Sequence, residues 1–95
     1  MEKEIVIFRK ERNGDIFAVF PYDICDPQLN MTCFAHVGQH SAMNPDYFRE
    51  TKPATPDEYE PLQKELESRG YNLEIKQRVN WERYRLAALE LQKKL

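Results

Sequence analysis

The side chains best suited to chemistry lie in the segment His36-Val37-Gly38-Gln39-His40-Ser41, which brings together both histidines of the chain. A glycine permits close backbone approach, and imidazole, amide and hydroxyl groups can donate and accept hydrogen bonds. The segment matches no complete catalytic or metal-binding signature. The pattern therefore indicates a polar contact site and does not specify a reaction.

We expect residues 36–47 to form the principal binding surface, because the segment begins at the end of a strand and enters a long polar loop. Such a surface suits a protein or a small polar ligand. The predicted contact residues are His36, Gly38, Gln39, His40, Ser41, Asp46 and Tyr47. The same rings and amide could instead pin the loop onto the sheet through hydrogen bonds, and this structural role stays open.

A metal-dependent or acid/base enzyme is another interpretation of the two histidines. His36 and His40 could act as base and acid, yet nothing in the sequence holds their rings within the roughly 3 Å that proton transfer requires. Cys25 and Cys33 add two zinc-capable side chains, but the close cysteine pair typical of structural zinc sites is missing. We therefore expect free thiols, no catalytic residue, no metal and no other cofactor.

Charge is distributed unevenly along this chain, whose net charge is −2. Residues 1–45 carry −2, residues 46–75 carry −4 and residues 76–95 carry +4. Basic and aromatic side chains near the end could contact phosphates and stack on bases, so a nucleic-acid-binding module is the first alternative function. Its candidate residues are Lys76, Arg78, Trp81, Arg83 and Arg85. A simpler interpretation is that they are the solvated faces of a strand and a helix.

The first two strands are predicted by apolar runs at residues 5–8 and 16–20, separated by Asn13-Gly14, a strong hairpin signal. If Asn13-Gly14 is a two-residue turn, Phe8 lies opposite Val19. Val6, Phe8, Phe17 and Val19 then share one face, while Ile5, Ile7, Ala18 and Phe20 share the other. Because both faces are apolar, we expect each to be covered.

Pro21 ends the second strand, a third strand is expected over residues 31–37, and residues 38–53 read as an irregular polar segment. Thr55-Pro56-Asp57-Glu58 predicts a helix start with a capping box, and Gly70 predicts its end. Alternating polarity over residues 71–79 indicates another strand. Asn80 is expected to cap a final helix.

The predicted fold is α+β, with the order β-β-β-α-β-α and a mainly antiparallel four-stranded sheet. One helix packs on the sheet. The final helix, from Trp81 to Lys94, carries apolar residues at helical spacing and either covers the second face or projects outward. Its apolar spacing would also suit a homodimer seam.

The chain of 95 residues predicts a single domain, with an α+β core over 1–79 and a C-terminal helix over 80–95. We expect no membrane partner, since no apolar run approaches the roughly 18 residues of a membrane span. The first residues lack the pattern of a signal peptide, which favours a cytoplasmic location.

Several blocks of the sequence resemble a group of short bacterial and phage proteins of unknown function. These blocks, in chain order, are residues 6–10, 14–22, 36–41, 53–59 and 70–73. The resemblance covers roughly residues 4–79 and implies no activity, ligand or catalytic residue. It implies a phage or mobile-element setting, where short proteins often bind a host component. We therefore predict a non-enzymatic interaction protein that contacts a host protein or a small polar ligand.

Overall fold

The computed structural model describes residues 3–35 and 40–94, with the backbone alone for His40 and Ser41. Within these residues the chain forms four strands, followed by helices and strands in alternation, which confirms the predicted α+β class. The elements are β1 (Glu4–Lys10), β2 (Ile16–Ile24), β3 (Met31–Ala35), β4 (His40–Met43), α1 (Pro45–Glu50), β5 (Lys52–Pro53), α2 (Pro56–Ser68), β6 (Leu73–Ile75) and α3 (Trp81–Lys94). The prediction that Pro21 ends the second strand was wrong, because β2 continues through Pro21 to Ile24. None of these helices has the length and apolarity needed to cross a membrane.

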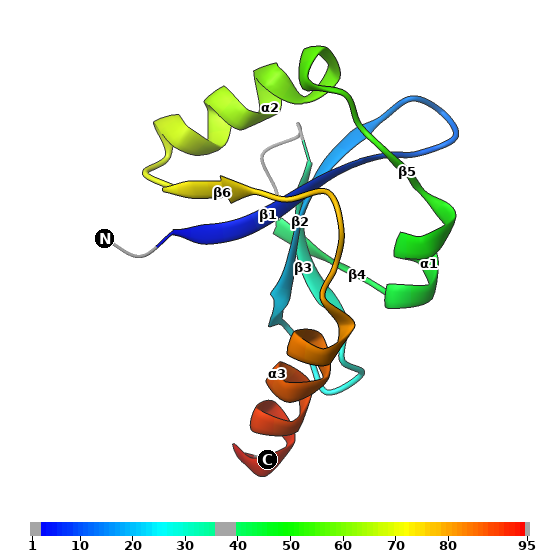
Figure 1. Ribbon diagram of the computed structural model, residues 1–95, viewed down its shortest axis with the longest axis vertical. Coiled ribbons are helices and arrows are strands. Elements are labelled where there is room, and N and C mark those ends of the chain that lie inside the picture. Colours follow the sequence, from blue (N-terminus) through cyan, green and yellow to red (C-terminus); the bar gives the residue numbers. More distant parts are fainter. Residues whose placement is uncertain (1–2, 36–39, 95) are drawn as a thin grey trace.

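The described strands form a six-stranded sheet with the order β4-β3-β2-β1-β5, and β6 also pairs with β1 (Figure 1). All pairs are antiparallel except β1 with β6, which is parallel. β5 pairs with the end of β1, at Arg9 and Lys10, and β6 pairs with its beginning, at Glu4 to Val6. Both use the same edge of β1, since the Val6 carbonyl accepts from Lys76 and the Phe8 carbonyl accepts from Ala54.

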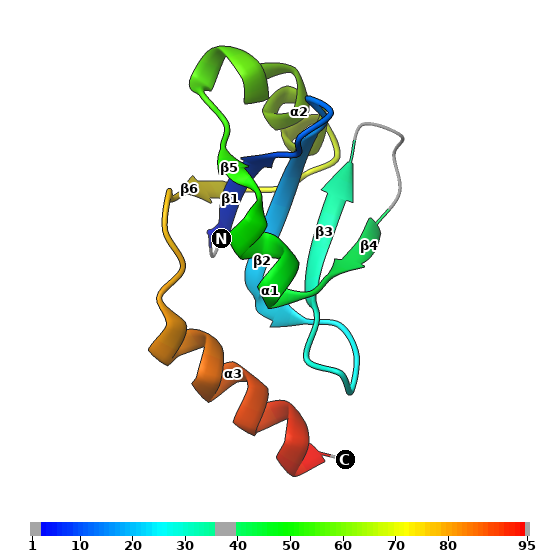
Figure 2. The same cartoon turned by 90° about the vertical axis from the view of Figure 1, so that its right-hand side faces the viewer.

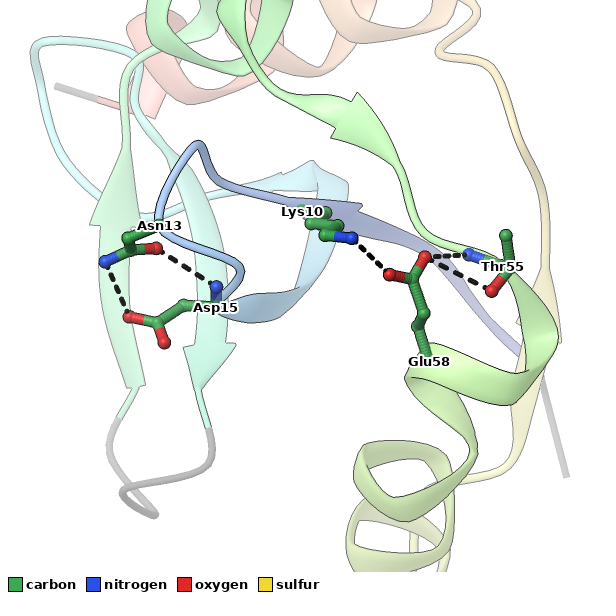
Figure 3. Close-up of polar contacts among 5 residues, drawn as sticks. All are labelled: Lys10, Asn13, Asp15, Thr55 and Glu58. Carbon is green, nitrogen blue, oxygen red and sulfur yellow. Dashed lines mark hydrogen bonds and ion pairs between the residues drawn. The ribbon is translucent and has the colours of Figure 1, made fainter.

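The hairpin between β1 and β2 has a longer turn than predicted. Glu11 donates its backbone N–H to Asp15, Gly14 donates to Glu11, and Gly14 has a φ of +94°. This is a three-residue loop, in which a glycine takes the left-handed position after a type I turn. The side chain of Asn13 braces the loop through hydrogen bonds to the backbone and carboxylate of Asp15 (Figure 3).

The extra loop residue shifts the strand register by one position, so the predicted pairing was wrong. Phe8 lies opposite Ala18, and Ile7 lies opposite Val19. A shift of one residue exchanges the faces of one strand relative to the other. Val6 and Phe8 therefore share a face with Ala18 and Phe20, and not with Phe17 and Val19 as predicted.

Both faces of the sheet are covered, as the apolar strands predicted, and α1 and α2 lie on opposite sides of it (Figure 2). The first buried cluster, called the α2-side core, contains Val6, Phe8, Ala18, Phe20, Phe34, Leu62 and Leu66. The second, called the α1-side core, contains Ile7, Val19, Met31, Cys33, Met43 and Phe48, with Trp81 and Tyr84 of α3 packed against it.

The segment predicted to be irregular, residues 38–53, contains regular structure in its described part. Residues 40–53 form β4, α1 and β5. Asn44 caps α1, because its side-chain oxygen accepts from the Asp46 N–H at 2.7 Å, and Pro45 occupies the first turn. Elements this short have weak sequence signals, and the prediction therefore read their polar residues as loop.

The last three elements follow the predicted order, with one strand much shorter than expected. β6 is confined to residues 73–75, and its pairing with β1 is extended only by hydrogen bonds at Asn72 and Lys76. Residues 76–80 instead connect β6 to α3. Asn80 caps α3 as predicted, since its side chain accepts from the Arg83 N–H at 3.1 Å.

Helix α2 begins and ends where the sequence predicted. The Glu58 carboxylate accepts from the Thr55 N–H at 2.9 Å and from the Thr55 hydroxyl at 3.1 Å, which is the reach-back half of a capping box. Gly70, with a φ of +97°, directly follows Arg69, the C-cap residue of the helix. Leu62 and Leu66 face the sheet and are fully buried.

Candidate functional site

The predicted contact residues His36, Gly38 and Gln39 lie outside the described residues. His40 and Ser41 belong to β4, where the backbone register places them opposite Phe34 and Cys33. β4 is the outermost strand at its end of the sheet, and α1 leads the chain from this edge to β5 at the other.

Asp46 and Tyr47 lie on α1 but have different surroundings. Asp46 is an exposed first-turn carboxylate that forms an ion pair with Arg49 at 2.8 Å. The Tyr47 hydroxyl instead donates a hydrogen bond to the Glu11 carboxylate at the end of the β1–β2 hairpin. Tyr47 is 42% exposed. Among the described residues it is the aromatic member of the set of exposed large hydrophobic side chains, the others being Leu86 and Leu89. The contact to Glu11 raises the pKa of the Tyr47 phenol, because an adjacent carboxylate disfavours phenolate formation.

Tyr47 faces a hollow between the hairpin and α1. This hollow has a volume of about 520 Å³, and it adjoins a second hollow of about 660 Å³ that reaches β5. The two hollows share Glu11, Arg12 and Glu50 and are therefore neighbours, and we refer to them together as the hairpin groove. Its lining residues are Lys10, Glu11, Arg12, Asn13, Tyr47, Glu50, Thr51, Lys52, Pro53 and Glu58.

The hairpin groove contains equal numbers of acidic and basic side chains. Lys10 and Glu58 form an ion pair at 2.5 Å across it (Figure 3). The hydrogen bond from Lys10 is the largest cause that lowers the pKa of Glu58 to about 2, followed by the Thr55 N–H. Glu58 therefore joins the wall of the groove to the start of α2, and its carboxylate stays ionised at neutral pH.

Thr51, one of the lining residues, is held in place by Arg9, a buried arginine near the end of β1. Its Nε donates to the Thr51 hydroxyl at 2.8 Å, and its Nη2 donates to the Phe48 and Thr51 carbonyls. The guanidinium also lies 4.5 Å from the centre of the Phe48 ring. Arg9 thus satisfies the carbonyl end of α1, where a cation also interacts favourably with the helix dipole.

The metal hypothesis finds no support in the part of the chain that the structure describes, where no cluster of three potential ligands occurs. Both cysteines are free thiols, Cys25 exposed and Cys33 buried in the sheet. Although Cys25 is an exposed residue, partial desolvation of its thiol is the largest cause that raises the thiol pKa, which keeps the thiol protonated at neutral pH. The proposed acid/base pair, His36 with His40, falls outside the described side chains.

The five candidate nucleic-acid contacts have different surroundings. The Trp81 ring is half-buried, with the Arg49 guanidinium 4.3 Å from its centre and with Phe48 and Tyr84 in T-shaped contacts. Arg83 lies over the Tyr22 ring, and Arg85 pairs with Glu82 at 2.8 Å. Base stacking on Trp81 would therefore require its contact with Arg49 to open. Lys76 and Arg78 are exposed in the connection between β6 and α3.

Sequence reasoning included Tyr47 among its candidate contacts but did not include the groove residues around it. Glu11 and Arg12 are polar residues beside a turn, and Glu50 and Lys52 occur in a segment predicted to be irregular. Glu11 and Tyr47 lie 36 positions apart, and no local pattern connects them. Only the mixed charge near Asn13-Gly14 could have drawn attention to the hairpin end.

The comparisons with known proteins give no family for this chain. No family model, no curated protein and no solved structure matches it. The geometry of the described residues is therefore the basis on which a function can be inferred.

Proposed function

We propose that this chain is a small non-enzymatic interaction protein that contacts a partner protein through the 36–47 segment, with the hairpin groove receiving part of the partner. The observation that carries the proposal is Tyr47, an exposed aromatic side chain that lies in a groove with charged walls. Tyrosine supplies a large amphipathic contact area at low cost in conformational entropy, and it is enriched among residues that dominate binding energy.

The composition of the groove favours a protein partner over a small ligand. Sites for small molecules are lined mainly by apolar and aromatic side chains that enclose most of the ligand. Here Tyr47 and Pro53 are the large apolar groups among ten lining residues, of which six carry charge. A peptide segment with both acidic and basic side chains complements such walls better than a compact ligand does.

The proposed phage or mobile-element setting is carried only by the resemblance of the sequence blocks, since no family model and no curated protein matches the chain. In that setting the partner is a host protein. The β4 edge at His40 and Ser41 supplies the start of the contact surface, and α1 carries it to the groove.

The test is quantitative capture of a partner from host lysate by the immobilised chain and by matched variants. We expect Tyr47→Ala and Glu50→Lys each to reduce capture about tenfold or more, as truncation of a central contact does. His40→Ala should also reduce capture while leaving the fold intact. Glu67→Lys reverses a similarly exposed carboxylate on α2 and should bind as the wild type does.

Circular dichroism of each variant separates loss of the contact from loss of the fold. Equal capture by wild type, Tyr47→Ala and His40→Ala would refute the proposal. A nucleic-acid partner remains the competing candidate, favoured by the exposed Lys76 and Arg78. Binding to DNA or RNA that weakens steeply with salt, and that Arg83→Ala with Arg85→Ala abolishes, would favour it instead.

A further inference from the structure

Helix α3 has a second apolar face that the rest of the described chain does not cover. Trp81 and Tyr84 pack against the α1-side core, and Ala88, at the same face of the helix, is 6% exposed. Leu86 and Leu89 are 53% and 45% exposed. At 100° per residue Leu86 lies about 160° from Ala88, on the opposite side of the helix, and Leu89 lies about 100° from Ala88, on its flank. In both views α3 leads away from the sheet, with the C-terminus at its far end (Figures 1 and 2).

The exposed leucines belong to a row with a symmetric pattern of side chains. Glu82, Leu86, Leu89 and Lys93 follow one another at intervals of four, three and four residues. This spacing places them in one stripe along the helix. The row reads acid, leucine, leucine, base, so its two halves are complementary in charge and identical in apolar content.

We propose that this stripe, named the α3 seam, binds a second copy of the chain with the two α3 helices antiparallel. A two-fold axis between Ala87 and Ala88 then places Leu86 opposite Leu89 of the partner subunit. The same axis places Glu82 opposite Lys93 of the partner subunit, and it does so twice in each dimer. A parallel arrangement would instead oppose Glu82 to its own copy and Lys93 to its own copy, which is unfavourable.

The size of the seam sets the strength of the dimer. α3 has 14 residues and is therefore about 21 Å long. An interface made by one such helix from each subunit is smaller than the roughly 1,200 to 2,000 Å² typical of stable complexes. We expect a reversible dimer with a dissociation constant on the order of 100 μM.

The proposed dimer does not depend on the proposed function. The residues of the α3 seam are absent from the lining of the hairpin groove. Failure of the partner-capture experiment would therefore leave the dimer untouched, and the reverse also holds.

Charge reversal tests the antiparallel seam. Sedimentation equilibrium of the full chain, up to roughly 1 mM, should show a monomer–dimer equilibrium in the wild type. Glu82→Lys and Lys93→Glu should each weaken self-association about tenfold or more, because each creates two like-charge pairs. The double variant should recover the wild-type constant. An equimolar mixture of the two single variants should form a heterodimer.

Control variants distinguish loss of the seam from loss of the helix. Leu86→Ala should weaken the dimer, whereas Gln63→Ala, an α2 substitution, should not. Far-UV circular dichroism checks that Glu82→Lys, which also loses the Arg85 ion pair, keeps its helix. A monomer at all concentrations overturns the proposal, as does a dimer unaffected by either charge reversal. A monomer that binds vesicles of phosphatidylcholine and phosphatidylserine through Leu86 would identify a lipid surface as the occupant instead.

Discussion

Arg9 shows how one buried side chain positions the groove. It is 8% exposed, and in the described residues its donors meet carbonyl and hydroxyl oxygens of residues 48 and 51 without a carboxylate. Burial lowers the pKa of its guanidinium, yet arginine stays protonated in proteins. Carbonyls that lack helical partners are good acceptors for such a cation. The link fastens the end of α1 to β1 and so fixes Tyr47 beside the hairpin.

At the residue scale, the Lys10–Glu58 pair predicts how stability varies with pH. Because the pKa of Glu58 falls from 4.5 to about 2 on folding, its ionised form stabilises the folded state above pH 4.5. That contribution declines as the pH falls from 4.5 to about 2. We expect Glu58→Gln to unfold at a lower temperature than wild type at pH 7. The difference should shrink over this acidic range.

Thermal unfolding of both proteins from pH 7 to pH 2 measures the difference directly. Glu90→Gln, which removes an exposed carboxylate from α3, is the matched control for a change in net charge. A difference between wild type and Glu58→Gln that stays constant through the acidic range would show that the Lys10 contact contributes nothing in solution.

At the scale of elements, the β1–β2 hairpin decides which side chains meet across the sheet. The loop has one more residue than a two-residue turn, and that residue moves the apolar set of β1 relative to β2. The left-handed backbone of Gly14 makes the longer loop possible. Apart from its chain neighbours, no atom of the described residues lies within 4 Å of the position that a Cβ would occupy there. The constraint at Gly14 is therefore on the backbone and not on packing.

We expect Gly14→Ala to reduce the free energy of unfolding by about 1 kcal/mol, since a left-handed conformation is strained for a residue with a Cβ. Gly14→Asn should cost less, because asparagine tolerates this region better. Urea denaturation with a common slope measures both. Equal stability of Gly14→Ala and wild type would mean that the loop can change to a different turn without loss.

At the scale of the whole molecule, contacts around Trp81 join α1, which carries Tyr47, to the C-terminal helix α3. Arg49 of α1 lies over the Trp81 ring at 4.3 Å, and Phe48 packs against the same indole at 6.2 Å between ring centres. Tyr84 continues the cluster and donates its hydroxyl to the Leu29 carbonyl at 2.6 Å. This aromatic cluster connects α1 with α3, although the two helices are not consecutive in the chain.

A double-mutant cycle with Arg49→Gln and Trp81→Leu should give a coupling energy of about 0.5–1 kcal/mol, the range for a partly exposed cation–π contact. Arg49→Gln combined with Gly14→Ala should be additive, since the two sites share no partner among the described contacts. Chemical denaturation of the four proteins in each cycle provides the measurement. Additivity of Arg49→Gln with Trp81→Leu would show that α1 and α3 are not coupled through this contact.

Local interactions explain which features could be predicted from the sequence. Thr55 and Glu58 begin α2, Gly70 follows its end, and Asn80 caps α3, each through groups within a few residues. The apolar runs of β1 and β2 likewise required two covered faces. Such signals depend only on neighbouring residues, so they can be recognised without knowing how the distant parts of the chain fold.

By itself, then, the sequence determined the α+β class, the two long helices and the two-sided core. Tertiary structure alone decided that β4 and β5 lie at opposite edges of the sheet and that β6 pairs in parallel with β1, whereas the hairpin register follows from the three-residue loop. It also decided that Tyr47 meets Glu11. The physical reason is that such contacts join residues far apart in the chain. Their stability comes from burial and pairing that exist only once the sheet has formed.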